Sequence, residues 1–162
     1  MTYDVHVLGP DDAPRLDALL DVFGEAFEDG ESYGRQRRPD AAYQQRLLAR
    51  DDFIAVVAVE GGTVVGGLAA YELHKFEQAR SEIYIYDLAV AAPHWRRGIA
   101  TALIGALQHV AAARGAWVIF VQADRGDDPA IALYTTLGVR EDVLHFDIPP
   151  KHADAAPRTP RP

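Results

Sequence analysis

The chain has 162 residues, of which 49% are hydrophobic and 25% charged, and its formal net charge is −8. This length suits one domain with its own core, and the composition is that of a globular protein rather than a disordered or membrane-spanning one. The absence of cysteine excludes disulfides, thiolate metal sites and covalent catalysis by a thiolate. The acidic balance disfavours nucleic acid as a partner and would attract a polycation to a cleft where carboxylates gather.

The first half of the chain predicts a strand, two helices and a hairpin. A strand is expected at residues 5–8, and a turn at residues 9–12 supplies the N-cap of a helix. In that helix the apolar residues recur at spacings of three and four, namely Leu16, Leu19, Leu20, Phe23 and Phe27. Residues 28–38, rich in glycine and charge, are expected to form a mobile loop before a second helix at 40–50. Strands at 53–59 and 64–73 flank Gly61-Gly62, a hairpin signal.

The second half alternates strands and helices. A strand at 81–90 is stopped by Pro93, and a helix follows to Arg114 with apolar residues at helical spacing, namely Ile99, Leu103, Ile104 and Leu107. A strand at 116–123, a helix at 129–137 and a last strand at 143–148 complete a mixed α+β layer fold within a single domain, residues 1–148. The tail at 149–162 holds half of the prolines and is expected to be flexible.

The segment from Glu82 to Leu107 joins a strand to a helix through a loop of small residues. A helix N-terminus offers open amides and the helix dipole to an anion, and Gly98 and Ala100 leave little side chain in the way. The segment therefore predicts a pyrophosphate site.

Two ordered motifs carry a resemblance to a known family. Trp95-Arg96-Arg97-Gly98-Ile99-Ala100 is similar to the Gln/Arg-x-x-Gly-x-Gly/Ala signature of the GNAT superfamily of acyl-CoA-dependent N-acetyltransferases. Trp95 stands where the family usually has Gln or Arg. This difference changes only a side chain, whereas in the family main-chain amides hold the pyrophosphate. Residues 127–138 follow the second family pattern, Asn/Asp-x-x-Ala-x-x-x-Tyr-x-x-x-Gly.

Within this family the chain resembles the type I aminoglycoside 3-N-acetyltransferases, in the segments 75–78, 80–87, 121–124 and 144–147. The resemblance covers roughly residues 4–148. It implies the GNAT fold, a central, mostly antiparallel twisted sheet flanked by helices. It also implies direct transfer of acetyl from acetyl-CoA to the 3-amino group of an aminoglycoside in a ternary complex, and a homodimer. The N-terminus lacks the basic start and apolar run of a signal peptide, so a cytoplasmic location is expected.

The resemblance further implies how coenzyme A is held. The pantetheine arm would pair with the main chain of Leu88, Ala89 and Val90. The phosphates would meet the loop and the first helical turn, namely Arg96, Arg97, Gly98, Ile99, Ala100 and Thr101, and the two arginine side chains suit phosphate chemically.

Attack of an amine on a thioester requires a neutral amine, a polarised carbonyl and a proton for the departing thiolate. Asp87, late in the motif strand, is placed to receive the substrate ammonium and its proton. The alternative is a buried carboxylate satisfied by backbone amides or an arginine. Tyr134 stands where many family members use a tyrosine hydroxyl to protonate the thiolate. Its alternative role is that of a core aromatic with a polar tip.

The other substrate candidates are carboxylates and one tyrosine. Asp124, Asp127 and Asp128 share one loop and could bind amines, or the loop could simply be solvated. Weaker candidates are Glu82, Asp147, Glu25, Glu28 and Asp29. Tyr84 and Tyr86 could stack on sugar rings, but strand alternation leaves open which face of the strand is core.

No metal site is predicted, because the histidines show no metal-ligand spacing: His6, His74, His94, His109, His145 and His152. His145 could be a catalytic base or a structural histidine. Two other functions remain open. One is acetylation of a different amine, such as a polyamine, an amino acid or a protein N-terminus. The other is an acyl-CoA-binding module without turnover, against which Asp87 and Tyr134 argue.

Overall fold

The structure is a computed structural model that describes residues 2–151. The chain divides into two compact units, one ending at Asp124 and one beginning at Arg125. Most of the expected tail, with His152, lies outside the described residues.

The first unit is built on a five-stranded sheet with the strand order β1-β2-β3-β4-β5. Its strands are β1 (Asp4–Val7), β2 (Phe53–Glu60), β3 (Thr63–His74), β4 (Ser81–Val90) and β5 (Ala116–Val121). Neighbouring strands are antiparallel from β1 to β4, whereas β4 and β5 are parallel. The mostly antiparallel sheet expected from the sequence is confirmed.

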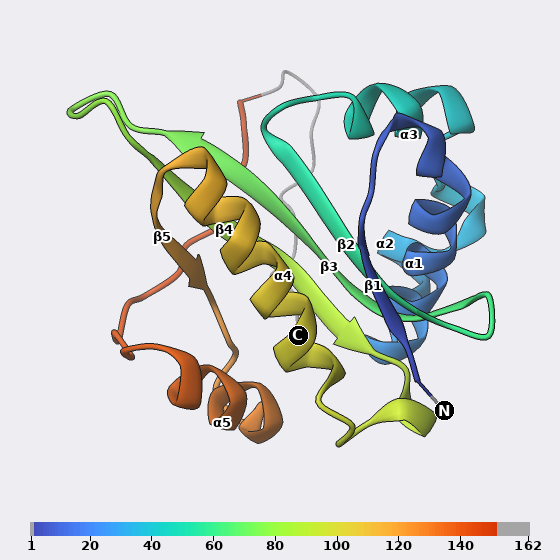
Figure 1. The fold of residues 1–162 in the computed structure, drawn as a ribbon. Helices are drawn as coiled ribbons and strands as arrows, with labels where there is room; N and C mark the ends of the chain where they lie inside the picture. Colours follow the sequence, from blue (N-terminus) through green and yellow to red (C-terminus); the bar gives the residue numbers. More distant parts are fainter. Residues whose placement is uncertain (1, 152–162) are drawn as a thin grey trace. The chain divides into compact units, whose positions relative to one another are not determined.

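Helices cover both faces of this sheet (Figure 1). The helix α4 (Ile99–Arg114) packs on one face, and α1 (Ala13–Ala26) packs on the other together with α3 (Ala41–Leu48). On the α1 face, Leu16, Leu19 and Phe23 form a cluster with Phe53, Ala55 and Val57 of β2. The intervening β2 residues Ile54 and Val56 are also buried. Because β2 is buried on both faces, its sequence is a continuous apolar run without alternation.

The turns follow local chemistry. Gly61 and Gly62 have φ of 56° and 81°, the positive values that a two-residue hairpin needs. The carboxylate of Asp40 accepts a hydrogen bond from the amide of Tyr43 and caps α3. These features confirm the predicted hairpin and second helix.

Two expectations about secondary structure are wrong. Residues 28–38 contain the short helix α2 (Gly30–Tyr33) and the 3-10 turn η2 (Arg35–Arg37) instead of a mobile loop. In the second unit α5 (Asp128–Leu137) forms as predicted, but the strand expected at 143–148 is absent from the described residues. An apolar pattern becomes a strand only where another strand satisfies its main chain, and these residues have no such partner in the described sheet.

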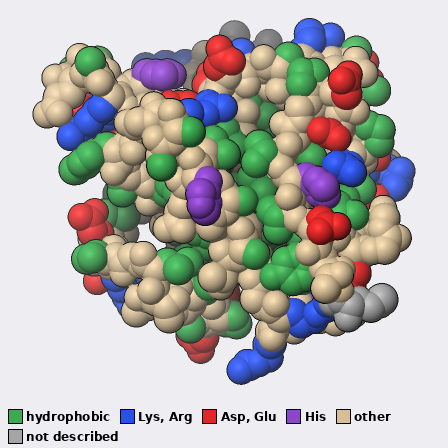
Figure 2. Space-filling model, in the orientation of Figure 1, with side chains coloured by type: hydrophobic (Ala, Val, Ile, Leu, Met, Phe, Trp, Pro, Cys, Tyr) green, Lys and Arg blue, Asp and Glu red, His purple; other side chains and the backbone are tan. Residues whose placement is uncertain are grey.

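Charges of both signs mix on the surface in view. Figure 2 shows Asp and Glu side chains next to Lys and Arg side chains rather than gathered by sign. The net negative charge is therefore not concentrated on this face. No helix in the described part of the chain is both long and apolar enough to cross a membrane.

Candidate functional site

The loop before α4 presents open amides. Arg96 and Gly98 have φ of 60° and 77°, so the chain turns sharply before the helix begins at Ile99. The first intrahelical hydrogen bond runs from the amide of Ala102 to the carbonyl of Gly98, at 2.9 Å. The amides of Ile99, Ala100 and Thr101 precede it, no side chain caps the helix, and its first turn has no acidic residue. Such an N-terminus attracts an anion through its amides and the helix dipole.

The space beside these amides is open. A Cβ atom at Gly98 would meet only the hydroxyl oxygen of Tyr3, at 3.9 Å. The positive φ of Gly98 itself favours glycine, because a side chain is strained there. The loop therefore fits the pyrophosphate that the sequence predicts.

A buried glutamate fixes this loop to the sheet. Glu60, at the end of β2, is 6% exposed. Its carboxylate accepts hydrogen bonds from Nη2 and Nη1 of Arg97 at 2.7 and 3.0 Å, and Nδ1 of His94 lies 2.9 Å from Oε2. The hydrogen bonds from Arg97 are the main cause that lowers the pKa of Glu60. The guanidinium of Arg97 is therefore engaged with a carboxylate of the protein itself.

Glu60 is not among the residues expected from the sequence. It lies 37 residues from Arg97, and distance along the chain hides such a contact. The available signal was a single charged residue at the end of an otherwise apolar strand.

The second half of β4 has a free edge. β5 pairs with β4 only from Ser81 to Ile85, whereas β4 continues to Val90. In the described sheet the main chain of Leu88, Ala89 and Val90 therefore has no strand on its β5 side. The indole of Trp95 donates to the carbonyl of Val90 at 2.6 Å. An extended molecule with amide groups can pair with such an edge, and Trp95 ties the loop before α4 to the end of the same strand.

A β-bulge decides which face the β4 side chains occupy. Asp87 pairs with Ala69, but Ile85 pairs with Ala70, so Tyr86 is an extra residue in β4. Regular alternation would put Tyr84 and Asp87 on opposite faces. With the extra residue, both lie on the α1 face, because their partners Tyr71 and Ala69 lie opposite Phe53 and Ala55 of β2.

A row of aromatic rings crosses this face. Neighbouring ring centroids lie 4.8 to 5.9 Å apart, in the order Phe53, Tyr71, Tyr86, Tyr84, Phe120. Tyr71 and Tyr86 remain 37% and 48% exposed. Burial is the main cause that raises the pKa of Tyr71, with smaller contributions that include the charge of Asp87. Rings next to a carboxylate suit a ligand that carries ammonium groups. Tyr71 was not among the residues expected from the sequence.

Asp87 has a partner that sequence reasoning missed. Its Oδ2 atom accepts a hydrogen bond of 2.6 Å from the hydroxyl of Tyr33, the last residue of α2. Tyr33 lies in the segment expected to be a mobile loop, so nothing in the pattern connected it with β4. Glu82, a weaker candidate, lies 3.5 Å from Nζ of Lys75.

Five further candidates lie at the end of the first unit or in the second unit, namely Asp124, Asp127, Asp128, Tyr134 and Asp147. Asp124 is exposed. Asp127 accepts from the amide of Ala130 and caps α5, and Asp128 lies in the first turn. Burial raises the pKa of Tyr134, and the charge of Asp127 raises it further. The phenol is therefore protonated at neutral pH, as a general acid must be. Asp147 lies 3.1 Å from His145.

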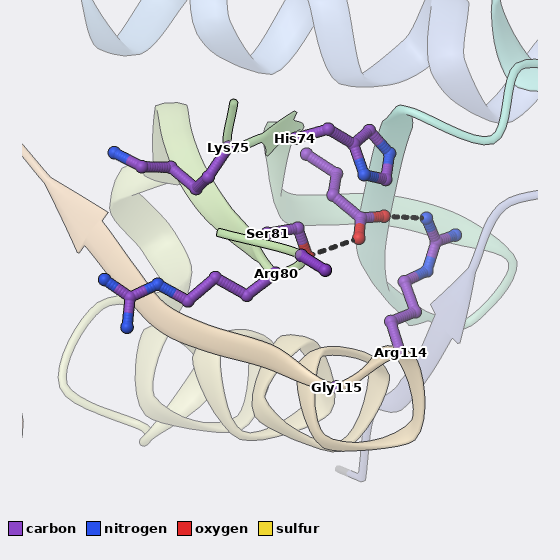
Figure 3. Close-up of a pocket in the computed structure, with 8 residues that line it drawn as sticks. His74, Lys75, Arg80, Ser81, Arg114 and Gly115 are labelled. Atoms are coloured by element: carbon purple, nitrogen blue, oxygen red, sulfur yellow. Dashed lines mark hydrogen bonds and ion pairs between the residues drawn. The ribbon is translucent and has the colours of Figure 1, made fainter. Parts of the chain in front are cut away.

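A separate pocket of ≈ 360 Å³ lies where α4 ends and β5 begins, at the other end of the helix from the loop that precedes α4. His74, Lys75, Arg80 and Arg114 contribute to its wall (Figure 3). No cluster of three potential metal ligands occurs among residues 2–151.

Comparisons with known proteins agree with the fold. The family model for the acetyltransferase (GNAT) family matches residues 16–139. Among solved structures, the chain is 63% identical to the aminoglycoside acetyltransferase HMB0005 from an uncultured soil metagenomic sample. That match has a TM-score of 0.90 and covers 93% of this chain and 100% of the other.

A second solved structure is the aminoglycoside acetyltransferase meta-AAC0020, also from an uncultured soil metagenomic sample, in complex with sisomicin. It is 32% identical with a TM-score of 0.84, and the match covers 92% of this chain and 97% of the other. A ribosomal-protein-alanine N-acetyltransferase from Brucella melitensis biovar Abortus 2308 is 25% identical with a TM-score of 0.70, over 91% and 98% of the two chains. Among curated proteins, none matches the chain. On the extent of the family match and the identity to HMB0005, the chain belongs to the acetyltransferase (GNAT) family.

Proposed function

We propose that the protein transfers the acetyl group of acetyl-CoA to the 3-amino group of an aminoglycoside. The observation that carries this proposal is the position of Asp87. It lies on the face with the exposed rings of Tyr71 and Tyr86, on the strand whose free edge leads to the phosphate loop. Support comes from two neighbours that are aminoglycoside acetyltransferases, at 63% and 32% identity. The 3-amino position rests on the sequence resemblance described above.

The cofactor proposal assigns each part of coenzyme A to a part of the first unit. The open amides of Ile99, Ala100 and Thr101, with Arg96, Arg97 and Gly98 of the loop, would hold the pyrophosphate. The free edge of β4 at Leu88, Ala89 and Val90 would pair with the pantetheine amides. Acetyl-CoA supplies the thioester and a thiolate leaving group.

The protein's own residues would then manage two protons. Asp87 binds the substrate ammonium and accepts its proton, so that the neutral amine nitrogen can attack the thioester carbonyl. The new carbon–nitrogen bond replaces the carbon–sulfur bond, and Tyr134 gives its phenolic proton to the departing thiolate. The second proton that the nitrogen loses as it becomes an amide then restores the phenol of Tyr134. Glu82, Tyr86, Asp124, Asp127, Asp128 and Asp147 are proposed as further substrate contacts.

The catalytic domain would include residues from both units, 1–148, since the family match itself spans them. The homodimer and the cytoplasmic location remain predictions.

The product would be an amide without the positive charge of the amine. Loss of that charge removes ionic hydrogen bonds to RNA phosphates, which would make the reaction a resistance mechanism.

A thiol-release assay tests the proposal directly. Acetyl-CoA is offered with gentamicin, kanamycin, spermidine or a peptide panel, and the acetylated nitrogen of the product is located by NMR. We expect release with an aminoglycoside and acetylation at the 3-amino group. Release with spermidine alone, or acetylation at another amine, would contradict the proposed substrate or position.

The variant Asp87→Asn tests the residue on which the substrate assignment depends. The change keeps the shape of the side chain and removes its charge. Loss of a desolvated charge partner typically costs about 2–5 kcal/mol, against under about 1 kcal/mol for a surface pair. Gentamicin affinity should fall more than about tenfold while acetyl-CoA affinity, measured by calorimetry, stays unchanged. Unaltered gentamicin binding would favour acetylation of a polyamine or a peptide.

A protein N-terminus is the second candidate substrate. The observation in its favour is the 25% identity to a ribosomal-protein-alanine N-acetyltransferase. The peptide arm of the same assay distinguishes it, since that substrate would give thiol release with peptides and none with gentamicin.

A further inference from the structure

We infer that Tyr33 and Arg38 position Asp87 for the acceptor amine, Tyr33 by direct contact and Arg38 through Tyr33. The inference rests on the proposed function, because it assigns a role in the same acceptor site. Neither residue belongs to a recognised motif in the sequence.

The first step is the burial of Arg38. Its side chain is only 7% exposed, although it follows the 3-10 turn η2. The Nη1 atom lies 2.9 Å from Oδ1 of Asp21 and 3.4 Å from Oδ2 of Asp17, both on α1. It also donates to the main-chain carbonyl of Asp17 at 3.3 Å. A buried guanidinium with several acceptors has one preferred position, so Arg38 anchors its segment on α1.

The second step links this anchor to Tyr33. The Nη2 atom of Arg38 donates to the main-chain carbonyl of Tyr33 at 2.7 Å. The ring of Tyr33 packs against Phe23 and Phe27, with centroid distances of 5.8 and 5.6 Å. The backbone of Tyr33 is thus held from one side and its ring from the other, which leaves its hydroxyl little freedom.

The third step is the contact with the candidate catalytic carboxylate. The Tyr33 hydroxyl donates to Oδ2 of Asp87 at 2.6 Å, across 54 residues of sequence. A hydrogen bond to one oxygen fixes the rotation of the carboxylate and therefore the direction of the other oxygen. Hydrogen bonds to charged groups are stronger than those between neutral groups. A rigid outer set of contacts is what a catalytic group needs to hold its geometry.

A double-mutant cycle on Tyr33 and Asp87 tests the inference. Tyr33→Phe keeps the ring and removes only the hydroxyl. We expect kcat/KM for the acceptor to fall about 10- to 100-fold, as for the loss of a hydrogen bond to a charged group. The calorimetric Kd for acetyl-CoA should not change. In an Asp87→Asn background the same substitution should have less than about a twofold effect, because the coupled partner is already altered.

Arg38 has a matched control in its own segment. Arg35 also pairs with Asp21, at 2.7 Å, but its side chain is 73% exposed and it makes none of the contacts described for Tyr33. Arg38→Lys should lower the acceptor kcat/KM in the same direction as Tyr33→Phe, whereas Arg35→Lys should leave it unchanged. Thermal melts of every variant show whether it is folded. If Arg38→Lys does not fold, the Tyr33 cycle decides the inference alone.

Several outcomes would overturn the inference. One is a change in the acceptor kcat/KM of less than about twofold in Tyr33→Phe. A second is a change that simply adds to that of Asp87→Asn. A third is a loss of acetyl-CoA affinity as large as the loss in kcat/KM. The cycle is measured with whichever amine the thiol-release assay shows to be accepted. Turnover of spermidine or a peptide but no aminoglycoside would contradict the proposed function, while the cycle measured on that amine would still decide the role of Tyr33. No turnover with any amine would contradict both.

Discussion

The two ends of α4 are both tied to the sheet by a buried glutamate, yet only one of them offers open amides. At the C-terminal end, Glu72 of β3 accepts hydrogen bonds of 2.6 Å from Ser81 and from Arg114 (Figure 3). Arg114 also contacts the carbonyl of Asp51. Gly115 follows in the left-handed conformation, and its amide bonds back to the helix. At the N-terminal end, Glu60 holds Arg97 in a similar way.

The two ends of α4 differ in which polar groups are left to bind a ligand. At the C-terminal end the polar groups named above bond to one another, and burial opposes the ionisation of Glu72 while hydrogen bonds from Ser81 and Arg114 favour it. The net effect lowers the pKa of Glu72. At the N-terminal end the ion pair fixes only the loop, and the helix amides have no capping side chain. An ion pair at a helix end thus anchors that end, whereas uncapped amides beside a glycine are what an anion would need in order to bind.

The largest expected effect separates the two glycines at these ends. Gly98 and Gly115 both have positive φ, 77° and 71°, so a valine at either position is strained. Gly98→Val also places a branched side chain in the space proposed for pyrophosphate, and we expect acetyl-CoA binding to be lost by calorimetry in a folded protein. Gly115→Val is the control, which should be less stable yet bind acetyl-CoA normally. Unchanged affinity in Gly98→Val would contradict the phosphate assignment.

The second-largest expected effect comes from removing Tyr134, the candidate general acid. If the N-terminal end of α4 holds the cofactor, its thiolate needs a proton during transfer. Tyr134→Phe should therefore lower turnover by roughly ten- to a thousandfold, with little change in acetyl-CoA affinity. Since burial raises the pKa of Tyr134 above its ordinary value of 10.0, the loss of activity caused by its deprotonation should be half complete only above that pH. A turnover within about twofold of the parent would mean that water protonates the thiolate.

Substitution of the arginines at the two ends of α4 should affect two different properties, acetyl-CoA affinity for Arg97 and stability for Arg114. Arg97→Ala should weaken acetyl-CoA binding by about three- to tenfold, because the loop loses its anchor to Glu60. Arg114→Ala should leave acetyl-CoA affinity unchanged. It should instead lower the free energy of unfolding by about 1–2 kcal/mol, less than for a fully buried pair because Arg114 is partly exposed. Urea unfolding and calorimetry measure the two quantities. The reverse pattern would contradict the division of roles.

The smallest effect concerns pH. Both glutamates have a pKa below the ordinary 4.5, so in acid each binds a proton more readily in the unfolded chain than in the folded one. Their contribution to stability is therefore complete at neutral pH and is lost as the pH falls below about 4.5. The melting temperature should stay level between about pH 8 and 6 with respect to these groups and fall in acid. Glu72→Gln should melt lower at neutral pH and show a shallower acid decline. An unchanged decline would mean that other carboxylates cause it.

The sequence by itself determined most of the strands and helices of this protein. Hydrophobic spacing located β1 to β5 and the longer helices because period two and period 3.6 reflect local geometry. The pyrophosphate site stays a prediction, and it could be made because its chemistry is contained in consecutive residues, Arg96 to Thr101. Tyr134 and Asp87 could be nominated because each occupies one position in a short motif.

Only the tertiary structure decided which side chains meet. A one-residue bulge at Tyr86 reverses the alternation of β4 and puts Tyr84 and Asp87 on one face. No pattern in the neighbouring residues indicates this bulge. The segment with Tyr33 looked like a loop because its order comes from Arg38 and from α1 rather than from its own propensity. The predicted strand at 143–148 did not form in the described residues, since a strand depends on a partner that its own sequence does not specify. Local geometry is determined by neighbouring residues, whereas long-range contacts depend on how distant residues pack.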